Sequence, residues 1–315
     1  MKKIFFRIVL LIGTPLTFLS TLWLWFVTRN KIGKIENSIF MGMGILPVKD
    51  HYYEPLINPK KHLIKSLRED RPLPGINFND KEQLALLSKF TYADELLKFP
   101  IEKKSDTEYF YNNGSYGSGD SEYLYNVVRY FKPKKIIEIG SGNSTRMVKN
   151  AFTQNKKEDA TYSCRHICIE PYEQPWLKDF GVELIRERVE TLDKSVFEQL
   201  EANDILFIDS SHMIRPQGDV LFEFLEILPI VKSGVIIHVH DIFMPKDYLT
   251  EWVNDHRLWN EQYLLEAFLS CNKEFKIIGA LNYLTHHHKA ALSAACPVFG
   301  KQKDKEPGAF WFQRV

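Results

Sequence analysis

Three short apolar segments of this chain each carry or end in a carboxylate, and these acids are well placed to do chemistry. Apolar runs of this kind are typical of buried parallel strands, which deliver polar groups to the carboxyl edge of a sheet. In open α/β sheets, ligands bind at that edge. We therefore expect three acids to share one ligand site: Glu138 in the segment 135–139, Glu170 at the end of 166–170 and Asp209 at the end of 204–209.

A glycine turn follows the first of these segments, where residues 138–145 read Glu-Ile-Gly-Ser-Gly-Asn-Ser-Thr. Gly140 and Gly142 let the backbone approach a ligand closely and adopt unusual dihedral angles. A dinucleotide-binding turn would need a third glycine where Thr145 stands. The carboxylate of Glu138 suits a ligand with a cationic amino group better than a phosphate. An ordinary strand-to-helix turn is the alternative interpretation of the glycines alone.

Histidines near two of the expected strand ends are candidates for acid–base chemistry. His212 follows Asp209 by three residues, and His238 and His240 directly precede Asp241. Period-two alternation puts His238 and His240 on one face of their strand, and we expect one of them to reach the ligand edge. A neutral imidazole near pH 7 can take a proton from a hydroxyl group. Any one of these histidines could instead only pack in the core.

Strand-like and helix-like segments alternate from residue 133 to the end of the chain. Strands separated by helix-length crossovers predict an α/β, Rossmann-like, doubly wound and mostly parallel sheet covered on both faces. Residues 286–305, rich in His and Lys, are expected to form a solvated loop before an antiparallel last strand. The expected strands are 135–139, 166–170, 182–185, 204–209, 234–239, 275–281 and 310–313, and the expected helices 144–153, 194–200, 220–228 and 260–269.

The N-terminal segment is predicted to be a membrane anchor. Residues 8–27 form a run of twenty residues without charge, which matches the roughly 20 residues of a membrane-spanning helix. A cleaved signal peptide is disfavoured, because the run is too long and no small-x-small site follows it. The positive charges on the two sides of the run are nearly equal in number, so they leave the orientation open. These charges are Lys2, Lys3 and Arg7 before the run and Arg29, Lys31 and Lys34 after it.

The chain is expected to have three parts: an anchor over 1–30, a linker with an accessory arm or lid over 31–118, and a catalytic domain over 119–315. The arm contains an expected helix at 80–90, capped by Asn79 or Asp80. Asp120 or Ser121 is expected to cap the first helix of the domain.

Composition and charge exclude several classes of protein. The 41 Lys and Arg residues nearly balance the 40 Asp and Glu residues, for a net charge of +1, so there is no nucleic-acid footprint. The four cysteines show neither a C-x-x-C pair nor a zinc spacing, which favours a reduced compartment.

Taken together, these motifs resemble the class I S-adenosylmethionine (SAM)-dependent methyltransferases. More narrowly, they resemble a bacterial branch with an E-I-G-S-G-x-S-T turn, an F-I-D-x-S-H strand end and H-x-H-D-I-F-x-P followed by Y-x-x-E-W. These motifs stand here at 138–145, 207–212, 238–245 and 248–252. The resemblance covers roughly residue 109 to the C-terminus. It implies a seven-stranded sheet with an antiparallel last strand and SAM as the cofactor.

The resemblance also implies roles for individual residues. The glycine turn would hold the methionine part of SAM, Glu170 its ribose hydroxyls, and residues 189–191 would border the adenine. The cofactor-binding residues are then Glu138, Gly140, Ser141, Gly142, Asn143, Glu170, Asp209 and Ser210. The residues expected to act on the methyl acceptor are His212, His240 and Asp241.

A divalent metal is an open question at this stage. Some O-methyltransferases of this fold bind a cation with acids after the fourth and fifth strands and an adjacent amide. Asp209 and Asp241 match the acids, but Ile242 stands where the amide would be, so the oxygen shell is incomplete. A histidine in the shell would favour a softer metal.

The sequence thus predicts a membrane-anchored SAM-dependent methyltransferase that acts on a hydroxyl of a small molecule, glycan or glycolipid. A non-catalytic, membrane-tethered scaffold that retains the fold is the alternative, and the missing third glycine disfavours an NAD-dependent oxidoreductase. Because SAM is made in the cytosol, we expect a single-pass protein of the inner (cytoplasmic) membrane with its catalytic domain in the cytoplasm.

Overall fold

The computed structural model describes residues 2–30, 32–51, 53–172 and 174–315. The chain divides into two compact units, one ending at Ser66 and one beginning at Leu67. The second unit holds the whole sheet together with residues 67–118, which the sequence assigned to the arm. The predicted roles of residues 1–30 as an anchor and 31–118 as a linker with an arm or lid stay predictions. Lys31, one of the flanking charges, lies outside the described residues.

The second unit is built on a seven-stranded sheet in the order β3-β2-β1-β4-β5-β7-β6. Neighbouring strands from β3 to β5 are parallel, whereas β7 is antiparallel to both β5 and β6. The mostly parallel sheet and its antiparallel last strand are therefore confirmed. The strands are β1 Lys135–Ile139, β2 Arg165–Ile169, β3 Glu183–Ile185, β4 Ile205–Ile208, β5 Ile236–Val239, β6 Phe275–Ala280 and β7 Phe310–Arg314.

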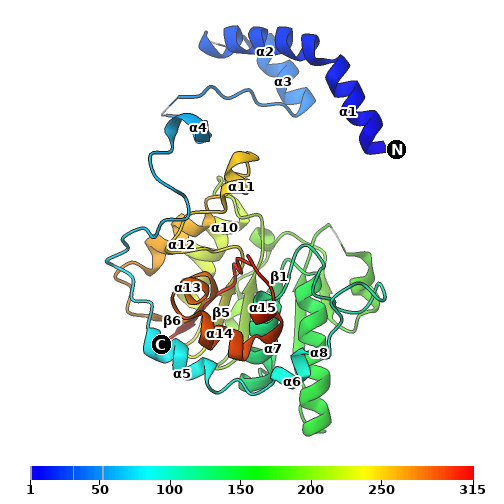
Figure 1. Cartoon of the computed structure of the whole chain (residues 1–315), viewed down its shortest axis with the longest axis vertical. Coiled ribbons are helices and arrows are strands. Elements are labelled where there is room, and N and C mark those ends of the chain that lie inside the picture. Colours follow the sequence, from blue (N-terminus) through cyan, green and yellow to red (C-terminus); the bar gives the residue numbers. More distant parts are fainter. Residues whose placement is uncertain (1, 31, 52, 173) are drawn as a thin grey trace. The chain divides into compact units, whose positions relative to one another are not determined.

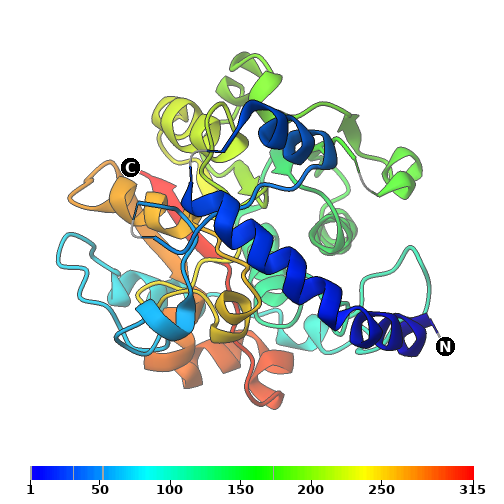
Figure 2. The ribbon, with the colours of Figure 1, turned by 90° about the horizontal axis from the view of Figure 1, so that it is seen from above.

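Helices cover both faces of the sheet, as Figures 1 and 2 show. Alternate strand residues enter two separate apolar cores, so that Ile136 belongs to one and Ile137 to the other. The first core lies against α5 (Asp80–Leu87), α6 (Ala93–Leu96), α7 (Asp120–Phe131), α8 (Asn143–Glu158), α13 (Leu281–His287), α14 (Lys289–Ala295) and α15 (Pro297–Lys301). The second lies against α9 (Ser195–Glu198), α10 (Asp219–Phe222), the π-helical turn Glu223–Ile227 and α12 (Glu261–Leu269).

The stretch 286–305 is mainly helical, so the prediction of a solvated loop there was wrong. The physical reason is that Leu284, Leu292 and Phe299 are buried in the first core and hold α13, α14 and α15 against it. The three consecutive histidines also find partners, each with a different carboxylate: His286 with Glu306 at 3.0 Å, His287 with Asp70 at 2.8 Å and His288 with Asp80 at 3.3 Å.

The N-cap of helix α7 lies one residue before Asp120, the earlier of its two expected caps. Gly119 is the N-cap, and its N–H donates to the Glu122 carboxylate at 3.0 Å. The Asp120 carboxylate instead accepts from the N–H of Ala309 at 2.7 Å, so it ties the helix to β7. The expected cap by Asp120 or Ser121 was therefore wrong. Asn79 does stand at the N-cap of α5, without a side-chain capping bond.

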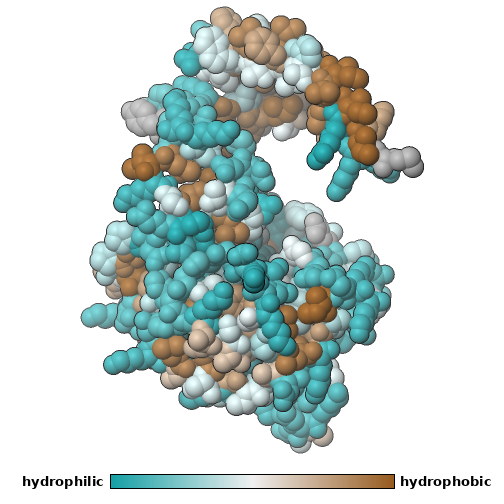
Figure 3. Space-filling view, in the orientation of Figure 1, coloured by the Kyte–Doolittle hydropathy of each residue, from teal (hydrophilic) through white to brown (hydrophobic). Residues whose placement is uncertain are grey.

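The first unit begins with two apolar helices, α1 (Lys2–Ile12) and α2 (Thr14–Arg29), followed by α3 (Lys34–Met43) and α4 (Pro59–His62). Large apolar side chains are exposed along α1 and α2, and Figure 3 shows them as brown areas, interspersed with white on α2. Among the described helices, none is long and apolar enough on its own to cross a membrane. The α1–α2 pair, bent by 59°, meets the length and composition criteria together.

Candidate functional site

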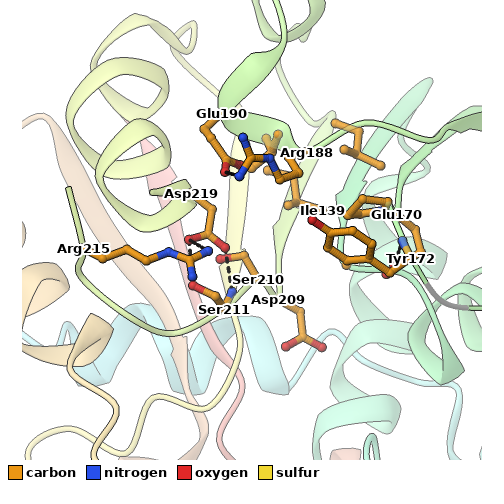
Figure 4. Close-up of a pocket in the computed structure, with 14 residues that line it drawn as sticks. Ile139, Glu170, Tyr172, Arg188, Glu190, Asp209, Ser210, Ser211, Arg215 and Asp219 are labelled. Carbon is orange, nitrogen blue, oxygen red and sulfur yellow. Dashed lines mark hydrogen bonds and ion pairs between the residues drawn. The ribbon is translucent and has the colours of Figure 1, made fainter. Parts of the chain in front are cut away.

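A cavity of about 480 Å³ lies at the carboxyl ends of β1, β2 and β4. Its size is in the range of small-molecule sites, and its position is the ligand edge expected for an open α/β sheet. Gly140, Glu170, Asp209 and Ser210 all line it, so the structure brings these predicted residues together (Figure 4). A smaller cavity of about 190 Å³ shares Gly140, Glu170 and Asp209 and adds Ser141, Gly142 and Asn143.

Gly140, directly after β1, lies very close to the end of the neighbouring strand β4. Its φ is +75°, and a Cβ built there would lie 1.9 Å from the carbonyl oxygen of Asp209. The N–H of Asp209 in turn donates to the carbonyl of Ile139 at 2.9 Å. Only glycine satisfies both the left-handed backbone and this contact. The turn then leads into α8, which begins at Asn143.

Glu138 lies behind the turn, and it lines neither of the two cavities described here. Its buried carboxylate accepts from the hydroxyl of Ser144 at 2.5 Å and bonds to Nε2 of His166 at 2.8 Å. Ser144 belongs to the first turn of α8, so Glu138 connects β1 to the start of that helix. Glu138, predicted as a cofactor-binding residue, is therefore placed to order the glycine turn through Ser144 rather than to face the cavity.

The Glu170 carboxylate joins two turns beside the cavity. It accepts from the N–H of Tyr172 at 3.0 Å and from the N–H of Ser141 at 3.3 Å. At the other side of the cavity, Val189 and Glu190 belong to a short 3-10 helix, Val189–Thr191, in the region expected to border the adenine.

An acid–histidine cluster adjoins the cavity at the ends of β4 and β5. Nε2 of His212 lies 3.3 Å from the Asp209 carboxylate and 3.7 Å from that of Asp241, and its Nδ1 lies 2.8 Å from the Glu261 carboxylate. Burial opposes protonation of His212, but the hydrogen bonds to Asp209 and Glu261 outweigh it and hold the imidazole pKa well above its usual value. The surrounding acids therefore favour the protonated imidazole of His212.

The two histidines of β5 occupy different environments. His238 is buried between the rings of Phe207, at 4.1 Å, and Trp311, at 4.5 Å between centroids, and burial holds its pKa well below the usual value. The ring of His240 reaches the ligand edge, with Nε2 3.5 Å from the Asp241 carboxylate. Burial opposes protonation of His240, but Asp241 and Asp209 outweigh it and raise its pKa. Of the two, His240 is the one that directly follows β5 and lies beside Asp241, although it lines neither of the two cavities described above.

Two residues of the cluster have left-handed backbone conformations without being glycine. The φ of His212 is +59° and that of Asp241 is +56°. Such conformations are uncommon outside glycine and recur at functional sites, where the surrounding structure imposes them.

Several residues of the site have no signal in the sequence. Asp219 accepts from the N–H of Ser211 at 2.9 Å and from its hydroxyl at 2.6 Å, so it shapes the loop after β4. The ring of Tyr116 lies 5.0 Å from that of His240. Burial raises the pKa of Asp120 to about 7, and the electrostatic interaction with His240 opposes that rise. Glu261 falls within the expected helix 260–269, and nothing in the sequence connects it to the site.

A metal ion is chemically compatible with this cluster. One ligand atom from each of Asp209, His212 and Asp241 lies within 4.8 Å of the others. Two carboxylates and an imidazole suit a divalent transition metal better than calcium or magnesium. The position of the expected amide is taken by Ile242, whose side chain is buried in the second core.

Comparison with known proteins agrees with the motifs. Residues 137–242 match the family described as a methyltransferase domain. An uncharacterized protein of Archaeoglobus fulgidus is 31% identical over 170 residues, which cover 49% of this chain and 74% of that protein. A solved structure of a putative protein-L-isoaspartate O-methyltransferase from Plasmodium falciparum, in complex with S-adenosyl-L-homocysteine (SAH), matches 50% of this chain and 83% of that one, with 11% identity and a TM-score of 0.28.

The chain carries a methyltransferase domain of the class I family over residues 137–242, and it is a SAM-dependent methyltransferase. This domain favours an enzyme over the non-catalytic scaffold considered from the sequence.

Proposed function

We propose that this methyltransferase binds SAM along the edge of the sheet and transfers its methyl group to an oxygen of the acceptor. The observation that carries the proposal is that Gly140, Glu170 and Asp209, which end three neighbouring strands, line one cavity. That cavity also extends to Val189 and Glu190, the region predicted to border an adenine.

The cofactor's parts match the chemistry along this edge. The carboxylate of Glu170 suits the two ribose hydroxyls, which donate hydrogen bonds to it. The turn from Ser141 to Asn143 precedes the N-terminus of α8, where exposed N–H groups favour the methionine carboxylate. Asp209 is the acid for the cationic amino group or for the sulfonium. SAM supplies the electrophilic methyl group.

His212 is the candidate base for the acceptor hydroxyl, with His240 and Asp241 beside it. As the hydroxyl oxygen attacks the methyl carbon, the carbon–sulfur bond breaks, SAH leaves, and the hydroxyl proton passes to Nε2 of His212. The imidazole must be neutral to accept that proton. The positive charge of bound SAM opposes that of an imidazolium and so lowers the pKa of His212 toward neutrality.

If a divalent cation binds, Asp209, His212 and Asp241 are the residues that would hold it. It would supply Lewis-acid chemistry that lowers the pKa of the acceptor hydroxyl.

The acceptor is proposed to be a hydroxyl of a small molecule, glycan or glycolipid, reached from the membrane surface. Exposed apolar side chains on α1 and α2 support an anchor in the inner membrane, and the need for cytosolic SAM supports a cytoplasmic catalytic unit. An anchored enzyme would meet a lipid-linked acceptor at high local concentration.

Transfer of a labelled methyl group tests this proposal. The full chain in detergent would be incubated with SAM carrying an isotopic methyl label and a glycolipid and polar-metabolite extract. We expect one labelled product with a methyl ether, formed by the wild type and not by His212→Ala. Labelling confined to nitrogen or carbon atoms of the products would contradict O-methylation.

A further inference from the structure

The buried carboxylate of Glu261 is bonded directly to the imidazole of His212, although 49 residues separate them. The side chain of Glu261 is 1% exposed, and its Oε2 lies 2.8 Å from Nδ1 of His212. Burying a carboxylate costs several kcal/mol unless a well-placed partner offsets it. His212 is that partner, because the second oxygen of Glu261 has no hydrogen-bond partner within the described part of the chain.

The residues around Glu261 hold the rest of His212 as well. The N–H groups of Asn260 and Glu261 donate to the carbonyl of His212 at 3.1 and 3.2 Å. The ring of Trp259 lies against the imidazole, with 4.2 Å between centroids. The side-chain oxygen of Asn260 accepts from the N–H of Ile214 at 2.6 Å. The segment 259–261 therefore fixes both the left-handed backbone and the ring plane of His212.

A second buried acid, Glu223, interacts electrostatically with Glu261. Glu223 lies in the π-helical turn, a type of irregularity frequent at functional sites. Its carboxylate accepts from the hydroxyl of Ser210 at 2.9 Å. Burial, and then the negative charges of Glu261 and Asp219, hold the pKa of Glu223 well above its usual value. Burial also raises the pKa of Glu261, but its hydrogen bond to His212 opposes that rise.

We propose that Glu261 is the positioning residue of the methyl-transfer site, which fixes His212 with its Nδ1–H toward Glu261 and its Nε2 toward Asp209 and Asp241. This inference rests on the proposed function of His212 as the base. Which nitrogen of a histidine is free for chemistry is set by the hydrogen bond that the other nitrogen makes. Without Glu261, the ring is free to carry its proton on Nε2, where it cannot accept another.

A simpler role for Glu261 is to favour the N-terminus of α12, since acids in the first turn stabilise a helix. That role predicts a change in stability only. It predicts no change in the tautomer of His212, so the two roles are separable.

The tautomer of His212 tests the proposal in the full chain. The protein would be labelled with ¹⁵N in its histidines, and the His212 signals assigned by their loss in His212→Gln. Long-range ¹⁵N–¹H spectra would be recorded at a pH where the ring is neutral. The variants are Glu261→Leu, which removes the acceptor, Glu261→Gln, which keeps an acceptor oxygen, and Glu266→Gln. Glu266 is the matched control, because it is a buried acid of the same helix but bonds to Arg71, at 2.8 Å.

We expect the proton on Nδ1 in the wild type and in Glu266→Gln, and on Nε2 in Glu261→Leu. The kcat for methyl transfer should fall about 10- to 100-fold in Glu261→Leu, with the KM for SAM unchanged and a smaller loss in Glu261→Gln. A wild-type tautomer in Glu261→Leu would overturn the proposal.

Two further outcomes are decided by the same set of proteins. If Glu261→Leu does not fold, the rate of Glu261→Gln decides: a larger kcat loss than in Glu266→Gln supports the proposal, and an equal one contradicts it. Absence of SAH binding by the wild type would refute the proposed function, whereas a wild type that binds SAH, with an unchanged tautomer in Glu261→Leu, would refute only the role of Glu261.

Discussion

The backbone of Gly140 lies so close to Asp209 that a Cβ on the glycine would be 1.9 Å from the aspartate carbonyl oxygen. This contact joins the turn after β1 to the end of β4, at the topological switch point of the sheet. Figure 4 shows the Asp209 side chain among the residues that line the cavity.

Gly140→Ala is expected to abolish SAM binding and to lower the free energy of unfolding by more than about 2 kcal/mol, because the new Cβ meets backbone and the φ is unfavourable. Gly181→Ala is the matched control, since Gly181 also has a positive φ, +81°, but nothing lies within 4 Å of its Cβ position. The control should lose about 1 kcal/mol and still bind SAM. Chemical denaturation and calorimetry measure both. Equal losses in the two variants would contradict the steric argument.

Glu170→Ala is expected to weaken SAM binding about 10- to 100-fold, because two hydrogen bonds to a charged group are lost. Glu183→Ala serves as the control. Glu183 is the first residue of β3, so it lies at the amino ends of the strands, away from the cavity, and it pairs with Arg165 at 2.8 Å. Its substitution should leave the Kd for SAM unchanged. Similar affinities for SAM in the wild type and Glu170→Ala would remove Glu170 from the cofactor site.

The rate of methyl transfer is expected to rise with pH through the pKa of His212. Its pKa in the folded protein is raised well above 6.5, so the ring is mostly protonated at pH 6.5 and becomes a base only above its own pKa. The ion pairs of His212 correspondingly stabilise the fold fully below about pH 6.5 and lose that contribution as pH rises through the raised pKa. A profile of kcat/KM for SAM against pH measures this midpoint in the free enzyme, with His286→Asn as the control. A rate independent of pH between 6 and about 9 would contradict His212 as the base.

Removal of divalent cations tests what neutralises the two acids of the cluster. Because the imidazole of His212 already lies between Asp209 and Asp241, we expect EDTA-treated protein to keep its activity. Loss of activity that manganese restores would instead identify these three residues as metal ligands, and Asp241→Asn would then abolish the restoration.

The sequence predicted the sheet well because buried parallel strands leave a local pattern. The apolar runs ending at Ile139 and Ile208 are recognisable without knowledge of their neighbours, and the glycine turn follows one of them. The stretch 286–305 was misread because its His and Lys residues mask the apolar positions that hold three short helices against the core.

The partners inside the site could not be predicted in the same way. Glu261 and His212 are 49 residues apart, and nothing in the local pattern of α12 connects an acid in its first turn to a strand end. The choice between His238 and His240 likewise depends on Phe207 and Trp311, whose rings enclose His238 only in the folded protein.

The central claim is that one cavity at the ends of β1, β2 and β4 holds SAM, and calorimetric titration of the full chain with SAH tests it most directly. The account predicts one site per chain with micromolar affinity, weakened by Glu170→Ala and lost in Gly140→Ala. Absence of binding at millimolar SAH, or binding that neither substitution affects, would contradict it.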